Sequence, residues 1–178
     1  MSDLPAQNKN QIFREPNITI RPISREDDGA MAQIVRENLQ NHHLDIPGTA
    51  YFDPQLDCLS RYYVEAPGQR GYFVAQLADG TIAGGIGVAR FPEFDRCGEI
   101  QKLYVRPDMQ HLGIGQQLLA HLETCAAGMG LERLYLETHS NLRQAPRFYE
   151  KNGYRKIPRP ESVVHSTMDL FYIKELTH

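Results

Sequence analysis

The spacing of apolar residues along the chain alternates between the two-residue period of strands and the longer period of helices. Residues 18–23 alternate and predict a first strand, which Pro22 confines to an edge or an end of a sheet. Apolar residues then recur at helical spacing and predict a helix that ends near Gln40. A second helix is expected to start at Asp53-Pro54, because Asp caps free amides and Pro fits a first helical turn.

Three consecutive strands are predicted in the middle of the chain, over residues 71–77, 82–91 and 97–105. Asp79-Gly80 separates the first two strands and is a strong signal for the turn of a hairpin. The second strand contains three glycines, which weaken a strand or mark bulges and close packing: Gly84, Gly85 and Gly87. We therefore expect three antiparallel neighbours in one sheet.

The rest of the chain predicts alternating helices and strands. The helices are expected over 113–127 and 145–152, and the strands over 134–138, 154–157 and 168–176. The strand–helix–strand unit from Glu99 to Thr138 should be parallel, with a right-handed crossover. Together these elements predict a single α/β (α+β) domain over residues 17–178, with a mixed, mostly antiparallel sheet of about six to seven strands and about four helices. Residues 1–16 are polar and are expected to form a flexible tail.

The charge balance and the apolar content exclude several classes of function. The chain has 19 basic and 22 acidic residues and a formal net charge of -3, which lacks the basic footprint of a nucleic-acid-binding protein. The longest nearly apolar run, residues 82–89, is far shorter than the ~20 residues that span a membrane. The N-terminus lacks the apolar stretch of a secretory signal. We therefore expect a cytoplasmic protein that binds neither nucleic acid nor membranes.

The cysteines and histidines do not predict a metal site. Cys58, Cys97 and Cys125 are too far apart for a CxxC pair, and we expect free thiols in a reducing compartment. The adjacent His42 and His43 point in different directions in an extended loop and lack two further ligands. A solvated loop is therefore favoured there, and no metal cofactor is expected.

Residues 110–115, with the sequence QHLGIG, lie between a predicted strand and a predicted helix. Glycines in such a loop let backbone amides turn inward, and the helix N-terminus adds positive potential, so the loop suits a pyrophosphate. It lacks the third glycine of the dinucleotide fingerprint and the Gly-Lys-Ser/Thr ending of a nucleotide-triphosphate loop. From this loop alone, an ordinary structural turn is an equal alternative.

A second motif, NLRQAPRFYEKNGY, follows at residues 141–154. Together with EIQKLYV at 99–105 and the QHLGIG loop, in this order and spacing, it closely resembles the GNAT superfamily of N-acetyltransferases. The resemblance covers residues 19–176 and is strongest over 99–157. It implies an acyltransferase that moves an acetyl group from acetyl-coenzyme A to a primary amine of a small molecule or peptide, by direct attack in a ternary complex.

The same resemblance implies which residues bind acetyl-coenzyme A. Backbone groups of Leu103 and Val105 would pair with the pantetheine arm as if it were a strand. Backbone amides of residues 110–115 would hold the pyrophosphate, and Leu112, where the family usually has a basic or small residue, would contribute only its backbone. The full expected set is Leu103, Tyr104, Val105, Gln110, His111, Leu112, Gly113, Ile114, Gly115, Gln116, Asn141, Ala145, Phe148 and Tyr149.

Two residues are candidates for acid–base catalysis. Within the family motif Tyr149 is a general acid for the departing thiolate, although the helix pattern alone favours a core tyrosine. Glu99 is the candidate base, directly or through water, and the alternative is a glutamate that is salt-bridged or that lies at a strand end. Because strand residues alternate, Glu99 is expected to share a face with Gln101, Leu103 and Val105. The backbone amide of Val105 would stabilise the tetrahedral oxyanion.

Several alternatives stay open at this point. The donor could be another acyl-coenzyme A, or the chain could be a binding module that has lost catalysis. The loop over 41–52 and His139 are candidates for lining the acceptor site. An aromatic wall for the acceptor, or else a plain core, is expected from Tyr51, Phe52, Tyr62 and Tyr63. The last strand could pair with a second copy of the chain, which would give a homodimer.

Overall fold

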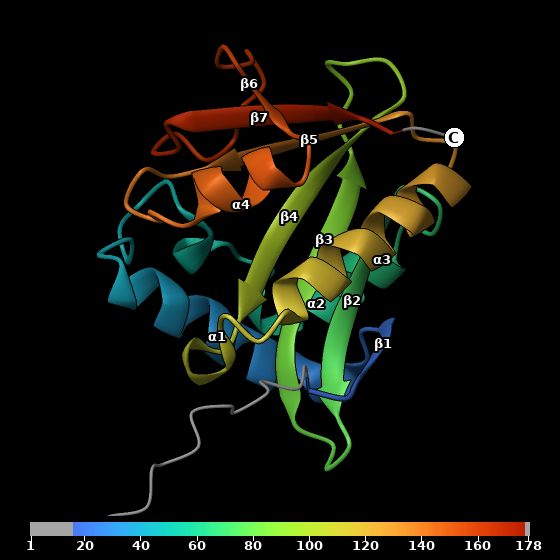
Figure 1. Ribbon diagram of the computed structural model, residues 1–178, viewed down its shortest axis with the longest axis vertical. Helices are drawn as coiled ribbons and strands as arrows, with labels where there is room; N and C mark the ends of the chain where they lie inside the picture. Colours follow the sequence, from blue (N-terminus) through green and yellow to red (C-terminus); the bar gives the residue numbers. More distant parts are fainter. Residues whose placement is uncertain (1–15, 177–178) are drawn as a thin grey trace, which may run out of the picture.

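The described part of the chain, residues 16–176 of a computed structural model, forms one seven-stranded sheet with the order β1-β2-β3-β4-β5-β7-β6 (Figure 1). The strands are β1 Ile18–Pro22, β2 Arg70–Leu77, β3 Ile82–Arg90, β4 Cys97–Val105, β5 Arg133–Thr138, β6 Arg155–Ile157 and β7 Leu170–Glu175. The α-helices are α1 Asp28–Asn41, α2 Leu59–Val64, α3 Ile114–Gly128 and α4 Ala145–Lys151. Single 3₁₀ turns are η1 Arg25–Asp27, η2 Ala50–Phe52, η3 Leu56–Cys58 and η4 Pro107–Met109. The tail predicted over 1–16 lies outside the described residues, apart from Pro16.

The predicted fold class is confirmed, because the sheet is mixed and mostly antiparallel. β1, β2, β3 and β4 pair antiparallel in sequence order, and Gly80 closes the β2–β3 hairpin with φ +90. β4 and β5 pair parallel, as the crossover through α3 predicts. Pro22 ends the edge strand β1, where its missing N–H costs no ladder hydrogen bond.

Helices cover both faces of the sheet and bury a separate apolar cluster on each. α3 packs on one face over β2, β3 and β4, where Leu118, Leu119 and Leu122 are fully buried. α1 and α2 cover the opposite face, where Met31 and Leu39 pack against Tyr72 and other residues of the sheet. In Figure 1, α3 and α4 lie in front of the sheet, and α1 and α2 lie behind it.

The glycines of β3 make room for tyrosine rings on the α1–α2 face. A Cβ atom at Gly85 would lie 2.5 Å from the Tyr72 ring, and one at Gly87 would lie 2.8 Å from the Tyr63 hydroxyl. Gly84 faces the other way, and its added Cβ would lie 2.6 Å from the backbone oxygen of Tyr104. The predicted close packing is confirmed, and it leaves room for the rings of Tyr63 and Tyr72 against β3.

β4 contains a β-bulge at Lys102 that the sequence pattern did not reveal. Gly87 pairs with Gln101, but Gly85 pairs with Tyr104, so β4 has one more residue than β3 between the two pairs. Lys102 takes up this extra residue with φ 50, a left-handed conformation that is costly for a residue with a side chain. The Tyr72 hydroxyl donates to the Lys102 carbonyl at 2.8 Å and holds the bulge.

The bulge reverses which face each later residue of β4 occupies. Leu103 and Val105 pack with Ile100 in the cluster under α3, whereas Tyr104 packs in the cluster under α1 and α2. The expectation that Glu99 and Gln101 share a face with Leu103 and Val105 was therefore wrong. Strict alternation holds only while a strand has no inserted residue, and the bulge breaks it.

β4 and β5 diverge soon after they meet. Their pairing extends only from Cys97 with Arg133 to Glu99 with Tyr135. β5 continues to Thr138 along β7, while β4 continues to Val105 along β3 (Figure 1). Beyond Glu99 this edge of β4 therefore has no partner strand among the described residues, and a cleft opens inside the sheet.

The second helix begins later than the sequence predicts, and Asp53 does not cap it. α2 is a six-residue helix that starts at Leu59, after the 3₁₀ turn η3. The Asp53 carboxylate instead forms ion pairs with Lys102 Nζ at 2.6 Å and with His165 Nε2 at 3.0 Å. The prediction failed because two cations far along the chain compete for the carboxylate more strongly than local amides do.

Replacing Gly84 with Ala should destabilise the sheet where β3 meets the bulged part of β4. The new Cβ would press on the backbone oxygen of Tyr104 and the Cα of Val105, neither of which can move freely. We expect a loss of about 1–3 kcal/mol in the free energy of unfolding, measured by urea titration. Gly29→Ala is the matched control, since nothing lies within 4 Å of its Cβ and it sits in α1. Equal effects of the two variants would contradict this packing account.

Candidate active site

Two adjoining cavities occupy the cleft between β4 and β5. We call the first the α3–α4 groove, a space of about 360 Å³ between β4, the segment 109–116 and α4. We call the second the inter-strand pocket, a space of about 100 Å³ between β4, β5 and the loop before β7. The residues that line both cavities are Leu103, Tyr104, Leu142, Ala145 and Tyr149. A molecule in one cavity therefore meets the other at the side chains of these residues.

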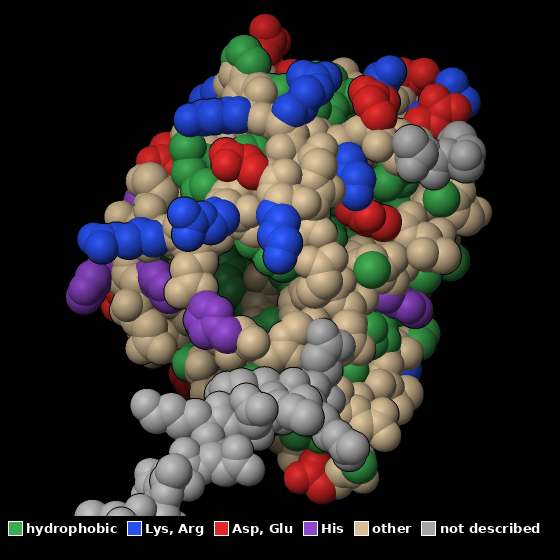
Figure 2. Space-filling view, viewed as in Figure 1, with side chains coloured by type: hydrophobic (Ala, Val, Ile, Leu, Met, Phe, Trp, Pro, Cys, Tyr) green, Lys and Arg blue, Asp and Glu red, His purple; other side chains and the backbone are tan. Residues whose placement is uncertain are grey.

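Most of the residues predicted to bind the cofactor line the α3–α4 groove. Every member of that set does so except Leu112, which packs against the core under α3, and Asn141. The Asn141 side chain donates to the His42 carbonyl at 3.1 Å instead. Lining residues that were not predicted are Asn38, His42, Met109, Leu142, Gln144 and Lys151. Figure 2 shows this face hollowed beside α4.

The loop before α3 has the backbone shape of an anion site. His111 has φ 65 and Gly113 has φ 81, so the chain turns sharply twice just before the helix begins. Such turns point successive amides into one concave space, and the first amides of a helix lack partners within the helix. α3 runs for 15 residues and adds the positive end of its dipole at the same place.

Three cations stand on α4 or just before it. Arg143, Arg147 and Lys151 are exposed, recur every four residues, and form no ion pair within residues 16–176. Lys151 also lines the groove, and Figure 2 shows Lys and Arg side chains along one side of the hollow. Free cations next to exposed amides favour a ligand that carries several negative charges.

Polar side chains at the inner end of the groove are already engaged. The Asn38 side chain donates to the Val105 carbonyl at 3.0 Å and accepts from Gln110 at 2.8 Å. The Gln116 side chain donates to Asn152 at 2.7 Å. Because the N–H and C=O of one strand residue point the same way, the Val105 N–H also points away from β3.

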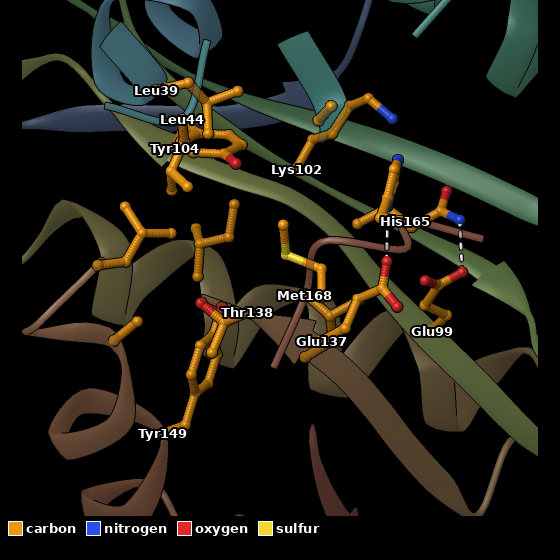
Figure 3. A pocket seen from close by; sticks show the side chains of 16 residues that line it. Leu39, Leu44, Glu99, Lys102, Tyr104, Glu137, Thr138, Tyr149, His165 and Met168 are labelled. Carbon is orange, nitrogen blue, oxygen red and sulfur yellow. Dashed lines mark hydrogen bonds and ion pairs between the residues drawn. The ribbon is translucent and has the colours of Figure 1, made fainter. Parts of the chain in front are cut away.

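The inter-strand pocket is apolar at one end and charged at the other (Figure 3). Leu39, Leu44 and Tyr149 lie around the apolar end, and Glu99, Glu137 and Lys102 lie at the charged end. Burial of so many ionisable groups is costly unless each is paired or can lose its charge. The partners of each group therefore decide which of them remains reactive.

Glu99 is the carboxylate without a cation. It accepts a hydrogen bond from the Gln101 amide at 2.7 Å, and Gln101 in turn accepts one from the Tyr63 hydroxyl at 2.7 Å. Burial raises the pKa of Glu99, the Gln101 hydrogen bond opposes this rise, and the nearby charge of Glu137 adds to it. Glu99 therefore holds a proton more readily than an exposed glutamate does.

The other charged groups are tied together by His165, from the loop between β6 and β7. The His165 ring lies 2.6 Å from the Glu137 carboxylate and 3.0 Å from the Asp53 carboxylate. Burial opposes its charge, but the hydrogen bonds to Asp53 and Glu137 prevail and raise the pKa of His165 to about 9. The pKa of Asp53 is lowered, because His165 and Lys102 outweigh the effect of burial.

Two tyrosine hydroxyls face the space between the apolar and charged ends. Tyr149 and Tyr104 line the pocket from opposite sides in Figure 3, and neither hydroxyl forms a hydrogen bond within residues 16–176. Burial raises the pKa of both hydroxyls. Each therefore carries its proton at neutral pH and can donate it to a bound molecule.

The remaining sequence expectations have mixed outcomes. Tyr63 belongs to the core on the α1–α2 face, Phe52 is largely exposed, and neither residue lines either cavity. His139 accepts a hydrogen bond from the Asn141 amide and lines neither cavity. Glu137 could have been found by the reasoning applied to Glu99, since it also interrupts an apolar strand. His165 stands in an irregular loop, and no local pattern marks it.

Two properties of the described residues concern metals and membranes. No group of three or more His, Cys, Asp or Glu side chains in residues 16–176 is arranged to hold a metal ion. Within the same residues, none of the helices has the length and apolar character needed to cross a membrane. Cys58, Cys97 and Cys125 are free thiols, and none of them lines either cavity.

Comparison with known proteins connects this geometry to a family. The family model described as Acetyltransferase (GNAT) family matches residues 36–154. The uncharacterized N-acetyltransferase YjgM of Escherichia coli (strain K12) is 33% identical over 141 residues, which are 78% of this chain and 82% of that protein.

Solved structures share the fold. A GNAT acetyltransferase from Staphylococcus aureus Mu50 matches with a TM-score of 0.80 and 22% identity, over 90% of this chain and 100% of that one. The PaiA N-acetyltransferase of Thermoplasma acidophilum, in complex with coenzyme A, matches with a TM-score of 0.71 and 22% identity, over 89% and 99% of the two chains.

Gly113→Ala should weaken binding of acetyl-coenzyme A. A side chain at φ 81 is strained by about 1–2 kcal/mol, and relief of that strain would reshape the loop before α3. We expect roughly a tenfold higher Kd by calorimetry, since about 1.4 kcal/mol is a factor of ten. Gly130→Ala is the matched control, because Gly130 has φ 73 and open space but lies beyond the far end of α3. If both variants lost affinity equally, the loop would not be the binding element.

Proposed function

The chain belongs to the acetyltransferase (GNAT) family and is an N-acetyltransferase that uses acetyl-coenzyme A, and we propose that it acetylates a primary amine held in the inter-strand pocket. The observation that carries this proposal is the position of Glu99. It is a buried carboxylate without a cation, in a small pocket that adjoins the α3–α4 groove at Tyr149. A carboxylate, a tyrosine hydroxyl and a groove lined by a cation thus adjoin in one cleft, which supports the proposal.

The α3–α4 groove has the chemistry that acetyl-coenzyme A requires. The turns at His111 and Gly113 offer amides to the phosphates, and Lys151 offers a cation. Val105 and Phe148 offer an apolar wall and a free strand edge to the pantetheine arm. When bound, acetyl-coenzyme A supplies a thioester carbonyl that an amine can attack.

Glu99 would remove the proton from the acceptor. An alkylamine is mostly protonated at neutral pH, with a pKa of about 10.4 for a lysine-like amine, and only the neutral form attacks. Burial raises the pKa of Glu99, which makes it a stronger base than an exposed glutamate once it is ionised. Gln101 holds the carboxylate in place at 2.7 Å, so its free oxygen can face the amine, directly or through water.

Tyr149 would donate a proton to the leaving sulfur. Its hydroxyl is unpartnered within residues 16–176, faces both cavities, and keeps its proton at neutral pH because burial raises its pKa. The Val105 N–H points away from β3 and is the candidate donor to the oxyanion. No cysteine lines either cavity, which favours direct attack by the amine over an acyl-enzyme.

The charge of the pocket favours a cationic acceptor without an acidic group beside its amine. The charged end holds three carboxylates and two cations if Asp53, the partner of both cations, is counted with the lining residues. The carboxylates are Asp53, Glu99 and Glu137, and the cations are Lys102 and His165. The excess negative charge attracts an ammonium and repels an acceptor carboxylate. A small alkylamine or diamine, or an exposed amine of a peptide, fits this requirement better than an α-amino acid.

Tyr149→Phe should retain acetyl-coenzyme A affinity but lose turnover. Without the hydroxyl the thiolate leaves unprotonated, and we expect kcat to fall by about 10²–10⁴-fold. The measurement is release of coenzyme A thiol with a panel of monoamines, diamines, amino acids and an amine-bearing peptide. Tyr154→Phe is the matched control, since its hydroxyl binds Glu123 outside both cavities. If the unaltered protein turned over no amine, the proposed acceptor chemistry would be wrong. Full activity of the variant would remove only the acid role.

Glu99→Gln should remove the acid limb of the pH profile. In the unaltered enzyme kcat/KM for the amine should fall as pH drops through the raised pKa of Glu99, because the protonated carboxyl is no base. The variant should be slower by about 10²–10⁴-fold and should lack that limb. Glu65→Gln, at an exposed position after α2, is the control. An unchanged profile in Glu99→Gln would indicate that water alone removes the proton.

A further inference from the structure

His165 bridges two carboxylates that come from distant parts of the chain. Its Nδ1 lies 2.6 Å from Glu137 on β5, 28 residues away in sequence. Its Nε2 lies 3.0 Å from Asp53 near η2, 112 residues away. Asp53 also pairs with Lys102 at the bulge of β4, at 2.6 Å. One imidazole ring therefore connects the β6–β7 loop, β5, the segment after η2 and, through Asp53, β4.

Both ring nitrogens face carboxylate oxygens, so both must carry a proton. A neutral imidazole has one N–H and one lone pair, and the lone pair would face a carboxylate without a hydrogen. The imidazolium satisfies both contacts. The raised pKa of His165, about 9, agrees with this geometry. The ring is thus a cation at neutral pH, in a buried cluster where its charge is weakly screened.

The bridge belongs to the inter-strand pocket and not to the α3–α4 groove. His165, Glu137 and Lys102 line the pocket, and no member of the cluster lines the groove. Figure 3 shows His165 bound to Glu137, with Glu99 on the neighbouring strand. A defect in the bridge should therefore affect the acceptor and leave the donor unaffected.

The charge of His165 also acts on Glu99. Asp53 and Glu137 contact the ring, Lys102 pairs with Asp53, and the charge of the ring acts on Glu99. The imidazolium lowers the pKa of Glu99, whereas the Glu137 carboxylate raises it. Without the imidazolium, Glu137 would face Glu99 unbalanced, and Glu99 would keep its proton to a higher pH.

We propose that His165 is the positioning residue of the acceptor site: as a cation between Asp53 and Glu137 it fixes the β6–β7 loop over the pocket and balances Glu137 so that Glu99 can ionise. The proposal rests on the amine-acetylating function proposed above. It assigns His165 no proton transfer with the acceptor. Its role is to hold the geometry and the charge balance in which Glu99 reacts.

The first test is His165→Gln, which keeps a polar side chain but removes the charge. We expect kcat/KM for the amine to fall on the order of 10²-fold, as small misplacements of a reacting pair do, with the KM for acetyl-coenzyme A within about twofold. The acid limb of the pH profile should move to higher pH. Adding Glu137→Gln to this variant should move the limb back, because the unbalanced carboxylate is then gone. A limb that stays at its original pH in His165→Gln would overturn the charge-balancing role.

Thr167→Val is the matched control for the loop. The Thr167 hydroxyl ties the same loop to the Pro47 carbonyl at 2.9 Å, without any charge. We expect this variant to leave the acid limb where it is. An equal shift in Thr167→Val and His165→Gln would mean that loop attachment alone matters, and would overturn the proposal.

A measurement on the free, unaltered protein needs no turnover. Nitrogen NMR of the His165 ring should show both nitrogens protonated at pH 7.5, with titration near pH 9. A neutral ring at that pH would overturn the proposal, even if His165→Gln failed to fold. Absence of amine turnover in the unaltered protein, together with a protonated ring, would remove the proposed function but keep the bridge. The two failures are thus distinguishable.

Discussion

The inserted residue at Lys102 is the constraint on which the cleft depends. Its left-handed backbone reverses the facing of the last three residues of β4, so Leu103 and Val105 line the groove from the α3 side, while Tyr104 reaches the pocket from the other side. Such a backbone costs on the order of 1–3 kcal/mol and persists only where its surroundings hold it. Here the Tyr72 hydroxyl binds its carbonyl and Asp53 binds its ammonium group. The geometry of the cleft thus depends on Tyr72 and Asp53, which hold the backbone and the side chain of Lys102.

The two cavities open beside the bulge because β4 and β5 diverge there. If β4 and β5 stayed paired beyond Glu99, hydrogen bonds between them would satisfy the backbone groups at this edge of β4 and leave no space between the two strands. Because the strands separate, the edge of β4 beyond Glu99 is free for an extended ligand. Ionisable side chains line the inter-strand pocket, which lies between the two strands. Tyr149 on α4 borders both spaces, so a molecule in either of them meets this side chain.

Local patterns predicted the elements well, and the site only in part. The boundaries of β4 and the positions of α3 and α4 follow from periodicity and from glycine punctuation, which act within a few residues. The bulge was missed because the residue that adopts the left-handed conformation is Lys rather than Gly, so alternation was extrapolated through it. Asp53 was assigned to a helix cap on local grounds, and His165 was not found, since their partners lie as far as 112 residues away. Contacts of that range are set by the assembled sheet and have no signature in a short window.

The buried charges at the pocket are better explained by chemistry than by stability. Pairing buried ions rarely recovers the cost of removing them from water, and apolar residues of similar volume would serve the fold at least as well. What the cluster achieves is a separation of neighbouring acid–base groups: the pKa of Asp53 is lowered, that of His165 is raised, and that of Glu99 is raised. Environments that drive the pKa values of adjacent groups apart assign a distinct role to each of them. Asp53 and His165 become fixed charges, and Glu99, whose carboxylate forms no ion pair and whose pKa burial raises, is left as the group best able to exchange a proton.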